Sequence, residues 1–194
     1  MGYSILHLGD VLDVLEDETE CKGILANFSC PFDEDIEYFL KDKAIINQKM
    51  GLSRTYLVYA RYKNENVLAG YFAITVKPLI VRSKVSGVVR KKITGFRSKE
   101  PSEVSVFLSG QLSKNFANGY AQIPLITGRE LLGLAMGQIL KIRHLIGGRV
   151  ILVECRDEPH LRRFYEDNGF EFVEQDGRDG LLKYIIEASK VTVE

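Results

Sequence analysis

The chain has 194 residues, of which 45% are hydrophobic and 27% charged, and its 26 Lys and Arg balance 26 Asp and Glu. This length suits one globular domain, the composition excludes wholesale disorder, and the neutral balance excludes a uniformly basic nucleic-acid coat protein. Because the three cysteines show no CxxC spacing and no apolar run approaches the roughly 20 residues of a membrane span, we expect a cytoplasmic protein without a disulfide framework, a zinc ribbon or a membrane anchor.

The first quarter of the chain predicts one strand and two helices. Residues 3–8 alternate as a strand does, and residues 11–15 are apolar at helical spacing. A longer helix is expected after Cys30, with Pro31 in its first turn, acidic residues near its N-terminus and Gly51 at its end.

The middle of the chain predicts three strands and an insertion. Residues 56–60 and 67–76 are rich in strand formers and are joined by a polar connector of hairpin length. Pro78 is expected to end the second of these strands. Residues from about 78 to 102 are read as an insertion without assigned secondary structure, and a further strand follows over residues 104–114.

The last third predicts helices and strands in alternation. A long helix opens near Thr127 and ends at Gly147, an apolar strand covers residues 150–153, and a short helix covers residues 160–168. Two final strands form a hairpin. This order implies an α/β or α+β fold whose sheet is neither wholly parallel nor wholly antiparallel.

The balanced charge is segregated along the chain. Eleven acidic residues lie between Asp10 and Asp42, whereas eight basic residues and no acidic one lie between Lys77 and Lys99. Two interpretations stay open, namely solvated faces of opposite sign, or a basic stretch that steers an anionic substrate or cofactor.

A short aromatic motif carries a family resemblance. The stretch from Phe164 and Tyr165 to Gly169 and Phe170 resembles the Phe-Tyr and Gly-Phe box of the GCN5-related N-acetyltransferase (GNAT) superfamily. The order of the expected elements is similar to the GNAT order over nearly the whole chain. The resemblance implies one domain over residues 1–194, with a mixed, mainly antiparallel sheet flanked by helices and a basic insertion before the fourth strand.

The resemblance also implies acetyl-coenzyme A as cosubstrate, without a metal. A helix N-terminus binds a pyrophosphate through its backbone N–H groups. In this chain only Gly128 matches a glycine of the family's phosphate loop, and Arg129 adds charge; the alternative is that Gly128 merely relaxes a loop before a helix. The fourth strand is expected to offer backbone groups to the pantetheine arm, with Gly110 accommodating a bulge, against the alternative of an ordinary strand end. The expected coenzyme contacts are Leu112, Ser113, Lys114, Thr127, Gly128, Arg129, Glu130 and Leu131.

Tyr165 is the candidate catalytic residue. The resemblance implies that its phenol protonates the departing thiolate, and a purely structural tyrosine is the alternative. Glu158 stands where many members of the family carry an asparagine that binds cofactor or substrate. Glu103 and Glu154 are candidates for the general base, and the spacing of the histidines indicates no metal site.

Three functions follow from these residues. The first is an acetyl-CoA-dependent N-acetyltransferase in which an unidentified primary amine attacks the thioester directly in a ternary complex. The second, motivated by the loop and Glu158, is a catalytically degenerate GNAT-fold binding or regulatory module. The third is a tRNA-directed acetyltransferase toxin that recruits nucleic acid through Lys77–Lys99. A homodimer formed through the C-terminal strands also stays open.

Overall fold

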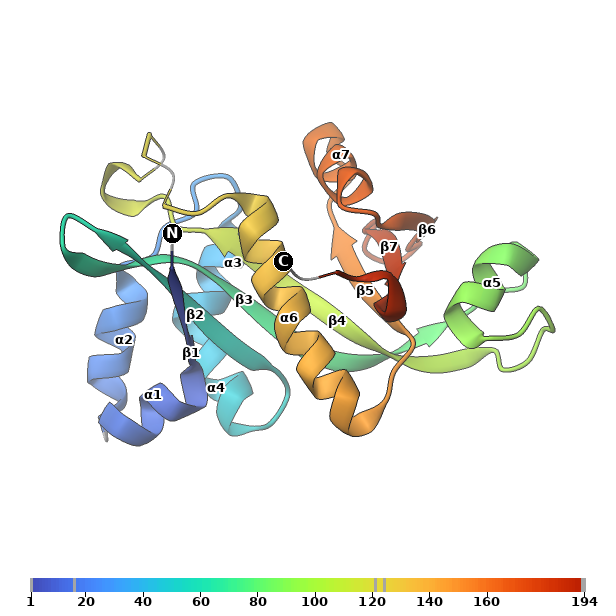
Figure 1. Cartoon of the computed structure of the whole chain (residues 1–194), viewed down its shortest axis with the longest axis horizontal. Coiled ribbons are helices and arrows are strands. Elements are labelled where there is room, and N and C mark those ends of the chain that lie inside the picture. Colours follow the sequence, from blue (N-terminus) through green and yellow to red (C-terminus); the bar gives the residue numbers. More distant parts are fainter. Residues whose placement is uncertain (1, 16, 121, 124, 193–194) are drawn as a thin grey trace. The chain divides into compact units, whose positions relative to one another are not determined.

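The structure is a computed structural model and describes residues 2–15, 17–120, 122–123 and 125–192 (Figure 1). Hydrogen bonding orders the strands in one mixed sheet as β1-β2-β3-β4-β5-β7-β6. Of the strand pairs with a described register, β4–β5 is parallel and the others are antiparallel. The strands are β1 (Tyr3–His7), β2 (Arg54–Tyr62), β3 (Glu65–Ile80), β4 (Glu103–Lys114), β5 (Val150–Cys155), β6 (Glu171–Gln175) and β7 (Leu182–Glu187). The expected mixed, mainly antiparallel sheet is confirmed.

The helices account for most of the remaining chain. They are α1 (Leu8–Leu15), α2 (Glu18–Ala26), α3 (Glu34–Tyr38), the π-helical turn η1 (Phe39–Lys43), α4 (Ala44–Lys49), α5 (Gly87–Thr94), α6 (Gly128–Ile146) and α7 (Pro159–Asp167). Within the described residues, none of these helices is long and apolar enough to cross a bilayer.

The chain divides into two compact units. The first consists of residues 1–75 and 111–135, and the second of residues 76–110 and 136–194. Each unit therefore draws on two separate stretches of sequence. The expectation of one domain over residues 1–194 stays a prediction.

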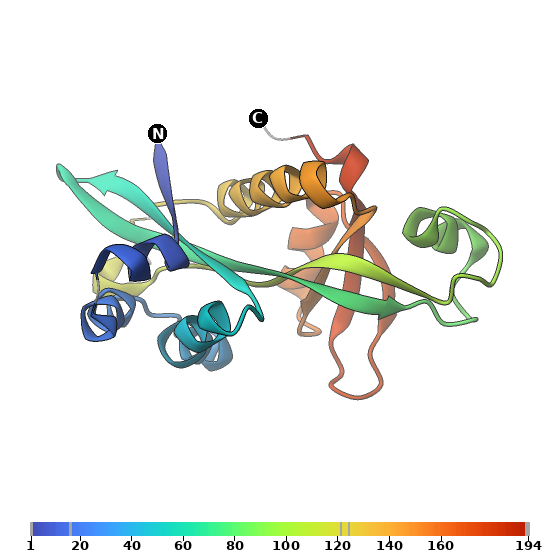
Figure 2. The same cartoon turned by 90° about the horizontal axis from the view of Figure 1, so that it is seen from below.

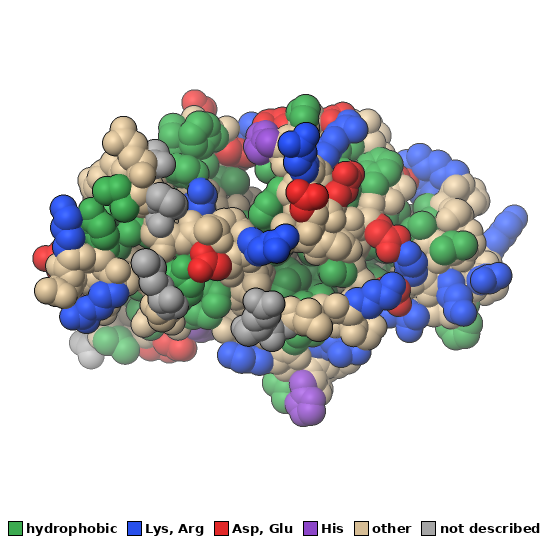
Figure 3. All heavy atoms as spheres, turned by 45° about the horizontal axis from the view of Figure 1, so that its top comes forward, with side chains coloured by type: hydrophobic (Ala, Val, Ile, Leu, Met, Phe, Trp, Pro, Cys, Tyr) green, Lys and Arg blue, Asp and Glu red, His purple; other side chains and the backbone are tan. Residues whose placement is uncertain are grey.

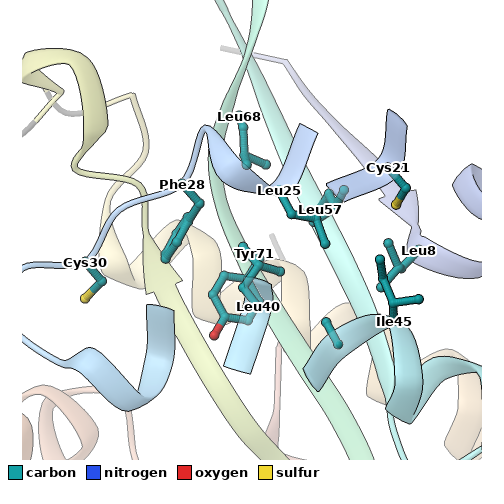
Figure 4. Packing of buried hydrophobic residues seen from close by; sticks show 11 residues of the cluster. Leu8, Cys21, Leu25, Phe28, Cys30, Leu40, Ile45, Leu57, Leu68 and Tyr71 are labelled. Atoms are coloured by element: carbon teal, nitrogen blue, oxygen red, sulfur yellow. The ribbon is translucent and has the colours of Figure 1, made fainter. Parts of the chain in front are cut away.

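The core of the first unit lies between β2 and β3 and the helices α1 to α4, which cover one face of these strands (Figures 1 and 2). Figure 4 shows Leu25, Phe28 and Leu40 gathered around Tyr71 in this core. The Phe28 ring meets the Tyr71 ring edge-on at 5.0 Å, and the Tyr71 hydroxyl donates a hydrogen bond of 2.6 Å to the backbone oxygen of Ile36. Tyr71 is thus anchored at both its apolar and its polar end.

Two predictions about the first unit need correction. The third helix begins at Glu34 and not at Pro31, because Asp33 is its N-cap and accepts from the backbone N–H groups of Asp35 and Ile36. Helix α2 was not predicted at all. It is capped by Asp17, whose carboxylate accepts from the Thr19 N–H at 2.7 Å.

The core of the second unit lies where β5 and β7 meet α5. Ile93 of α5 packs in one buried cluster with Leu79 and Val81 of the preceding segment and with Leu152 and Ile185 of the strands. The basic insertion is therefore an ordered helical segment whose apolar side belongs to the core.

Arg90 fixes this insertion from within. Its residue is only 3% exposed, and its guanidinium donates to the backbone oxygens of Lys99 at 3.0 Å, Val81 at 3.1 Å and Arg82 at 2.8 Å. Five N–H donors in a rigid fork make arginine suited to tying several carbonyls together.

The prediction that Pro78 ends a strand was wrong, because β3 continues to Ile80. The register of β3 with β2 ends at Ile74, so Pro78 lies beyond that ladder and its missing N–H removes no hydrogen bond from it.

Candidate functional site

The end of β4 is the first part of the candidate site. Ser113 is buried, and its hydroxyl donates to the Lys114 backbone oxygen at 2.9 Å and lies 3.5 Å from the Cys30 sulfur. The parallel register of β4 with β5 covers only Phe107–Ser109, although β4 continues to Lys114. Gly110 follows directly, and a Cβ there would meet only Leu108 side-chain atoms at 3.5 Å or more, so no close packing demands a glycine.

Gly70 brings two of the expected coenzyme segments together. A Cβ at Gly70 would lie 2.6 Å from the Ser113 backbone oxygen, 3.1 Å from the Lys114 Cα and 3.3 Å from a Leu131 methyl carbon. The backbone of β3 therefore approaches β4 and α6 more closely than any residue with a side chain permits. This role of Gly70 was not predicted, although an isolated glycine inside a strand signals a close approach.

Asn115 anchors the end of β4 and was also missed. It is 4% exposed, and its Oδ1 accepts from the Ser29 N–H at 3.0 Å and the Ala117 N–H at 2.9 Å. Its Nδ2 donates to the Asn27 and Leu68 backbone oxygens, both at 2.9 Å. The side-chain amide of Asn115 thus makes four hydrogen bonds, all to backbone groups, and these fix the chain directly after Lys114.

The N-terminus of α6 is closed by a reciprocal capping box. The Glu130 N–H donates to the Thr127 hydroxyl oxygen at 3.1 Å, and the Glu130 carboxylate accepts from the Thr127 N–H at 2.8 Å and from its hydroxyl at 2.7 Å. The Leu131 N–H donates to the Thr127 backbone oxygen at 3.0 Å. Three of the five N–H groups expected to face a phosphate thus make hydrogen bonds within this first turn.

Glu130 is held from a second direction by β1. The Tyr3 hydroxyl donates to its other carboxylate oxygen at 2.8 Å. The hydrogen bonds from Thr127, followed by the one from Tyr3, lower the pKa of Glu130, so its carboxylate is ionised at neutral pH. Burial, with the hydrogen bond to Glu130, raises the pKa of Tyr3 to about 12. A negative charge of the chain's own therefore lies at the helix end that favours anions.

Tyr165 lies in the second unit, on α7. It is 9% exposed, and its ring contacts Phe164 at 5.1 Å, Phe170 at 5.6 Å and Tyr184 at 6.1 Å between centroids. Burial, with a smaller contribution from Cys155, raises the pKa of Tyr165 well above its ordinary value, so the phenol keeps its proton at neutral pH. Both a general acid and a structural tyrosine have these properties.

The other residues singled out in the sequence have simpler surroundings. Both carboxylate oxygens of Glu154 accept from the Lys77 ammonium at 2.9 Å, whereas Glu103 is exposed. Glu158 is the N-cap residue of α7 and lies 3.3 Å from a ring nitrogen of His160. Burial raises the pKa of Cys155 to about 11, which makes its thiol a weak nucleophile. In the described part of the chain, no group of three or more His, Cys, Asp or Glu side chains is placed to hold a metal ion.

The fold partly neutralises the basic segment. Its cations gather over α5 and the neighbouring strands, at the right-hand end of the surface in Figure 3. Lys77 pairs with Glu154, Arg82 and Lys84 lie 3.7 Å from Glu174, and Lys92 pairs with Glu171, while Arg90 is buried on carbonyls. Within the described residues, Lys91, Arg97 and Lys99 have no acidic partner.

No family model and no curated protein matches this chain. Solved structures do match it over nearly its whole length. A structure of a tyrosine-to-phenylalanine mutant of KacT has 17% sequence identity, covers 97% of this chain and 96% of its own, and gives a TM-score of 0.65. AtaT complexed with acetyl-methionyl-tRNAfMet has 17% identity, 94% coverage of both chains and a TM-score of 0.64. AtaTR bound with AcCoA has 16% identity, 96% and 94% coverage and a TM-score of 0.60.

The chain has the GNAT fold. At this level of identity the likeness concerns the fold, which the aromatic box and the element order predicted. All eight residues that were expected to contact the coenzyme belong to the first unit, and the expected general acid, Tyr165, belongs to the second. Within the first unit, the structure brings Ser113, Lys114 and Leu131 together around Gly70.

Proposed function

We propose that this protein is an acetyl-CoA-dependent N-acetyltransferase that transfers an acetyl group to a primary amine by direct attack. The observation that carries this proposal is the GNAT fold over nearly the whole chain, shared with proteins solved with acetyl-CoA. The coenzyme supplies the activated acetyl thioester. All three cysteines are buried, so none is placed as a covalent nucleophile, and a ternary complex requires none.

The backbone of Leu112, Ser113 and Lys114 is the proposed support for the pantetheine amides. It suits this task because Gly70 and Asn115 fix its position from two sides. A fixed backbone can orient the thioester for attack without reorganising during the reaction.

The first turn of α6, Thr127–Leu131, is the proposed support for the pyrophosphate, with Arg129 adding positive charge. Glu130 already complements the helix end, so its carboxylate opposes a second anion there. We therefore expect moderate coenzyme affinity.

Tyr165 is the proposed general acid. As the amine nitrogen bonds to the thioester carbonyl carbon and the carbon–sulfur bond breaks, the phenol gives its proton to the thiolate. The amine's own proton leaves to a base or water. Because its raised pKa keeps Tyr165 protonated, the acid is available across the neutral range.

Release of free thiol from acetyl-CoA, measured over a panel of primary amines, tests this function. We expect Tyr165→Phe to lower kcat by about 10²-fold or more, the usual contribution of a general acid. Tyr184→Phe is the matched control, because Tyr184 belongs to the same aromatic cluster but donates its hydroxyl to Glu166. Equal kcat for Tyr165→Phe and the wild type at every pH removes Tyr165 from catalysis. Coenzyme binding without transfer to any amine supports the degenerate binding module instead.

A tRNA-directed toxin activity is the second candidate. It is favoured by the complex of AtaT with acetyl-methionyl-tRNAfMet and by the three cations of the basic segment without acidic partners, Lys91, Arg97 and Lys99. If these three contact phosphates, log K for tRNA falls with log[salt] with a slope of about −2 to −3. Mobility-shift titrations of the wild type and the triple alanine variant measure this slope, and no shifted band at low salt excludes the candidate.

A further inference from the structure

A small cavity of about 80 Å³ lies in the second unit, between the start of the basic segment and strands β5, β6 and β7. Its lining residues are Lys77, Pro78, Leu79, Ile80, Arg82, Glu154, Glu174, Asp176, Arg178 and Lys183. Lys183 is followed in β7 by Tyr184, whose ring contacts Tyr165. Because successive strand residues point to opposite faces, the cavity and Tyr165 lie on opposite faces of β7. The cavity is therefore separate from the proposed general acid.

The inner wall of the cavity contains two carboxylates and one ammonium. The side chains of Glu174, Asp176 and Lys183 are 4%, 8% and 11% exposed. The Lys183 ammonium donates to Asp176 at 2.6 Å and lies 3.6 Å from one oxygen of Glu174. Within these three residues one negative charge is in excess, and it is offset by Arg82 and Lys84, each 3.7 Å from Glu174, and by Arg178, 3.9 Å from Asp176.

The second carboxylate oxygen of Glu174 is the group left without a hydrogen bond. It is buried, and its nearest cationic nitrogens, on Arg82 and Lys84, both lie 3.7 Å away, which is beyond hydrogen-bond distance. A buried acceptor that makes no hydrogen bond is destabilising, so a donor that reached this oxygen would bind favourably.

The rim of the cavity has the opposite sign. The side chains of Arg82 and Arg178, which line the cavity, are 40% and 83% exposed, and Lys84, which lies 3.7 Å from Glu174, is 63% exposed. Lys77 at the rim is already paired with Glu154. Over the whole lining, four cations face three carboxylates, so a purely cationic ligand is disfavoured and an anionic group at the entrance is favoured.

We propose that this cavity binds a small zwitterion, with its ammonium on the buried Glu174 oxygen and its carboxylate or phosphate between Arg82, Lys84 and Arg178. The volume holds a group of a few heavy atoms, which suits an ammonium and its first carbons. The rim cations that cover Glu174 swing outward and take the anionic end. The site does not depend on acetyl-CoA.

Calorimetric titration of the full chain at low salt tests this site without any coenzyme. The zwitterionic probes are β-alanine and O-phosphoethanolamine. The single-charge probes, which carry charge of only one sign, are ethylamine, propionate and inorganic phosphate. At least one zwitterion is expected to bind 10-fold or more tightly than every single-charge probe. Comparison of the two zwitterions shows whether the rim takes a carboxylate or a phosphate.

Two variants test the assigned ends of the ligand. Glu174→Gln should lower zwitterion affinity 10-fold or more, and Arg178→Ala, at an exposed position that leaves the fold intact, should lower it at least 3-fold. Arg97→Ala, a cation of the insertion outside the cavity, should leave it unchanged. Zwitterions that bind no more tightly than single-charge probes overturn the proposal, as does unchanged affinity in Arg178→Ala.

Discussion

Replacing Asn115 with alanine tests how the end of β4 is held. The side chain joins the strand end to two other segments of the first unit through four hydrogen bonds, all to backbone groups. Alanine removes all four and leaves two N–H groups and two carbonyl oxygens without their partners in a site that is 4% exposed.

The expected cost follows from that count. At about 1 kcal/mol of net stability for each hydrogen bond, Asn115→Ala should lower the free energy of unfolding by about 3–4 kcal/mol, since water entering the vacated space recovers part of the loss. Because Asn115 follows the proposed pantetheine segment directly, acetyl-CoA affinity should fall as well.

Urea unfolding followed by circular dichroism measures this change. Asn66→Ala is the matched control, because Asn66 lies exposed on β3, and surface changes of this kind stay within about 0.5 kcal/mol. A loss of less than about 1 kcal/mol for Asn115→Ala would refute the reasoning, because that is the value of a single net hydrogen bond.

Three further substitutions test other contacts. Gly70→Ala places a Cβ 2.6 Å from a backbone oxygen and should cost about 1–3 kcal/mol of stability. Gly133→Ala inside α6, where a Cβ would meet nothing within 4 Å, should instead gain about 0.5–1 kcal/mol. Thermal melts that rank the two variants in the opposite order would contradict this prediction. Arg90→Lys keeps the charge but loses the fork that binds three carbonyls, and should cost about 2 kcal/mol or more in urea unfolding; an unchanged midpoint contradicts it. Glu130→Gln should lower the free energy of unfolding by about 1 kcal/mol at pH 7 and should strengthen acetyl-CoA binding. The pKa of Glu130 is lowered in the folded protein. The ionised carboxylate therefore contributes its full stabilisation above the unfolded pKa of about 4.3, and this stabilisation is lost as the pH falls through the folded pKa. A stability difference between Glu130→Gln and the wild type that persists unchanged at pH 2 would contradict this prediction.

The sequence predicted best where apolar periodicity is long and uninterrupted. The strand from Val150 and the long helix from Gly128 have continuous apolar faces, and both lie where they were expected. The aromatic box around Tyr165 predicted the fold through its resemblance to the GNAT motif, and its rings pack on one another within a single local segment.

The misses have local and non-local causes. Helix α2 places only Cys21 and Leu25 in the core, among acidic residues, so its sequence has a weak apolar pattern and packing stabilises it. The third helix was expected to begin at Pro31, but it begins at Glu34 because the Asp33 carboxylate caps it through two hydrogen bonds. Helix α5 begins after Ser86, its N-cap, and ends at Gly95, which is left-handed. Both signals are in the sequence, but the basic residues around them were interpreted only as a charged segment.

The candidate site depended on contacts that no local pattern shows. The partners of the basic segment, such as Glu154 and Glu171, come from strands far along the chain, so its charge could not be judged from the sequence. Likewise, Asn115 and Gly70 act only through segments that the fold brings beside them. Such positions become visible once the strand order is known.

Calorimetric titration of the full chain with acetyl-CoA tests the central claim most directly. The proposed acetyltransferase binds with one site per chain and a dissociation constant in the micromolar range, and Glu130→Gln binds more tightly than the wild type. No detectable binding at millimolar acetyl-CoA, in either protein, would contradict the account.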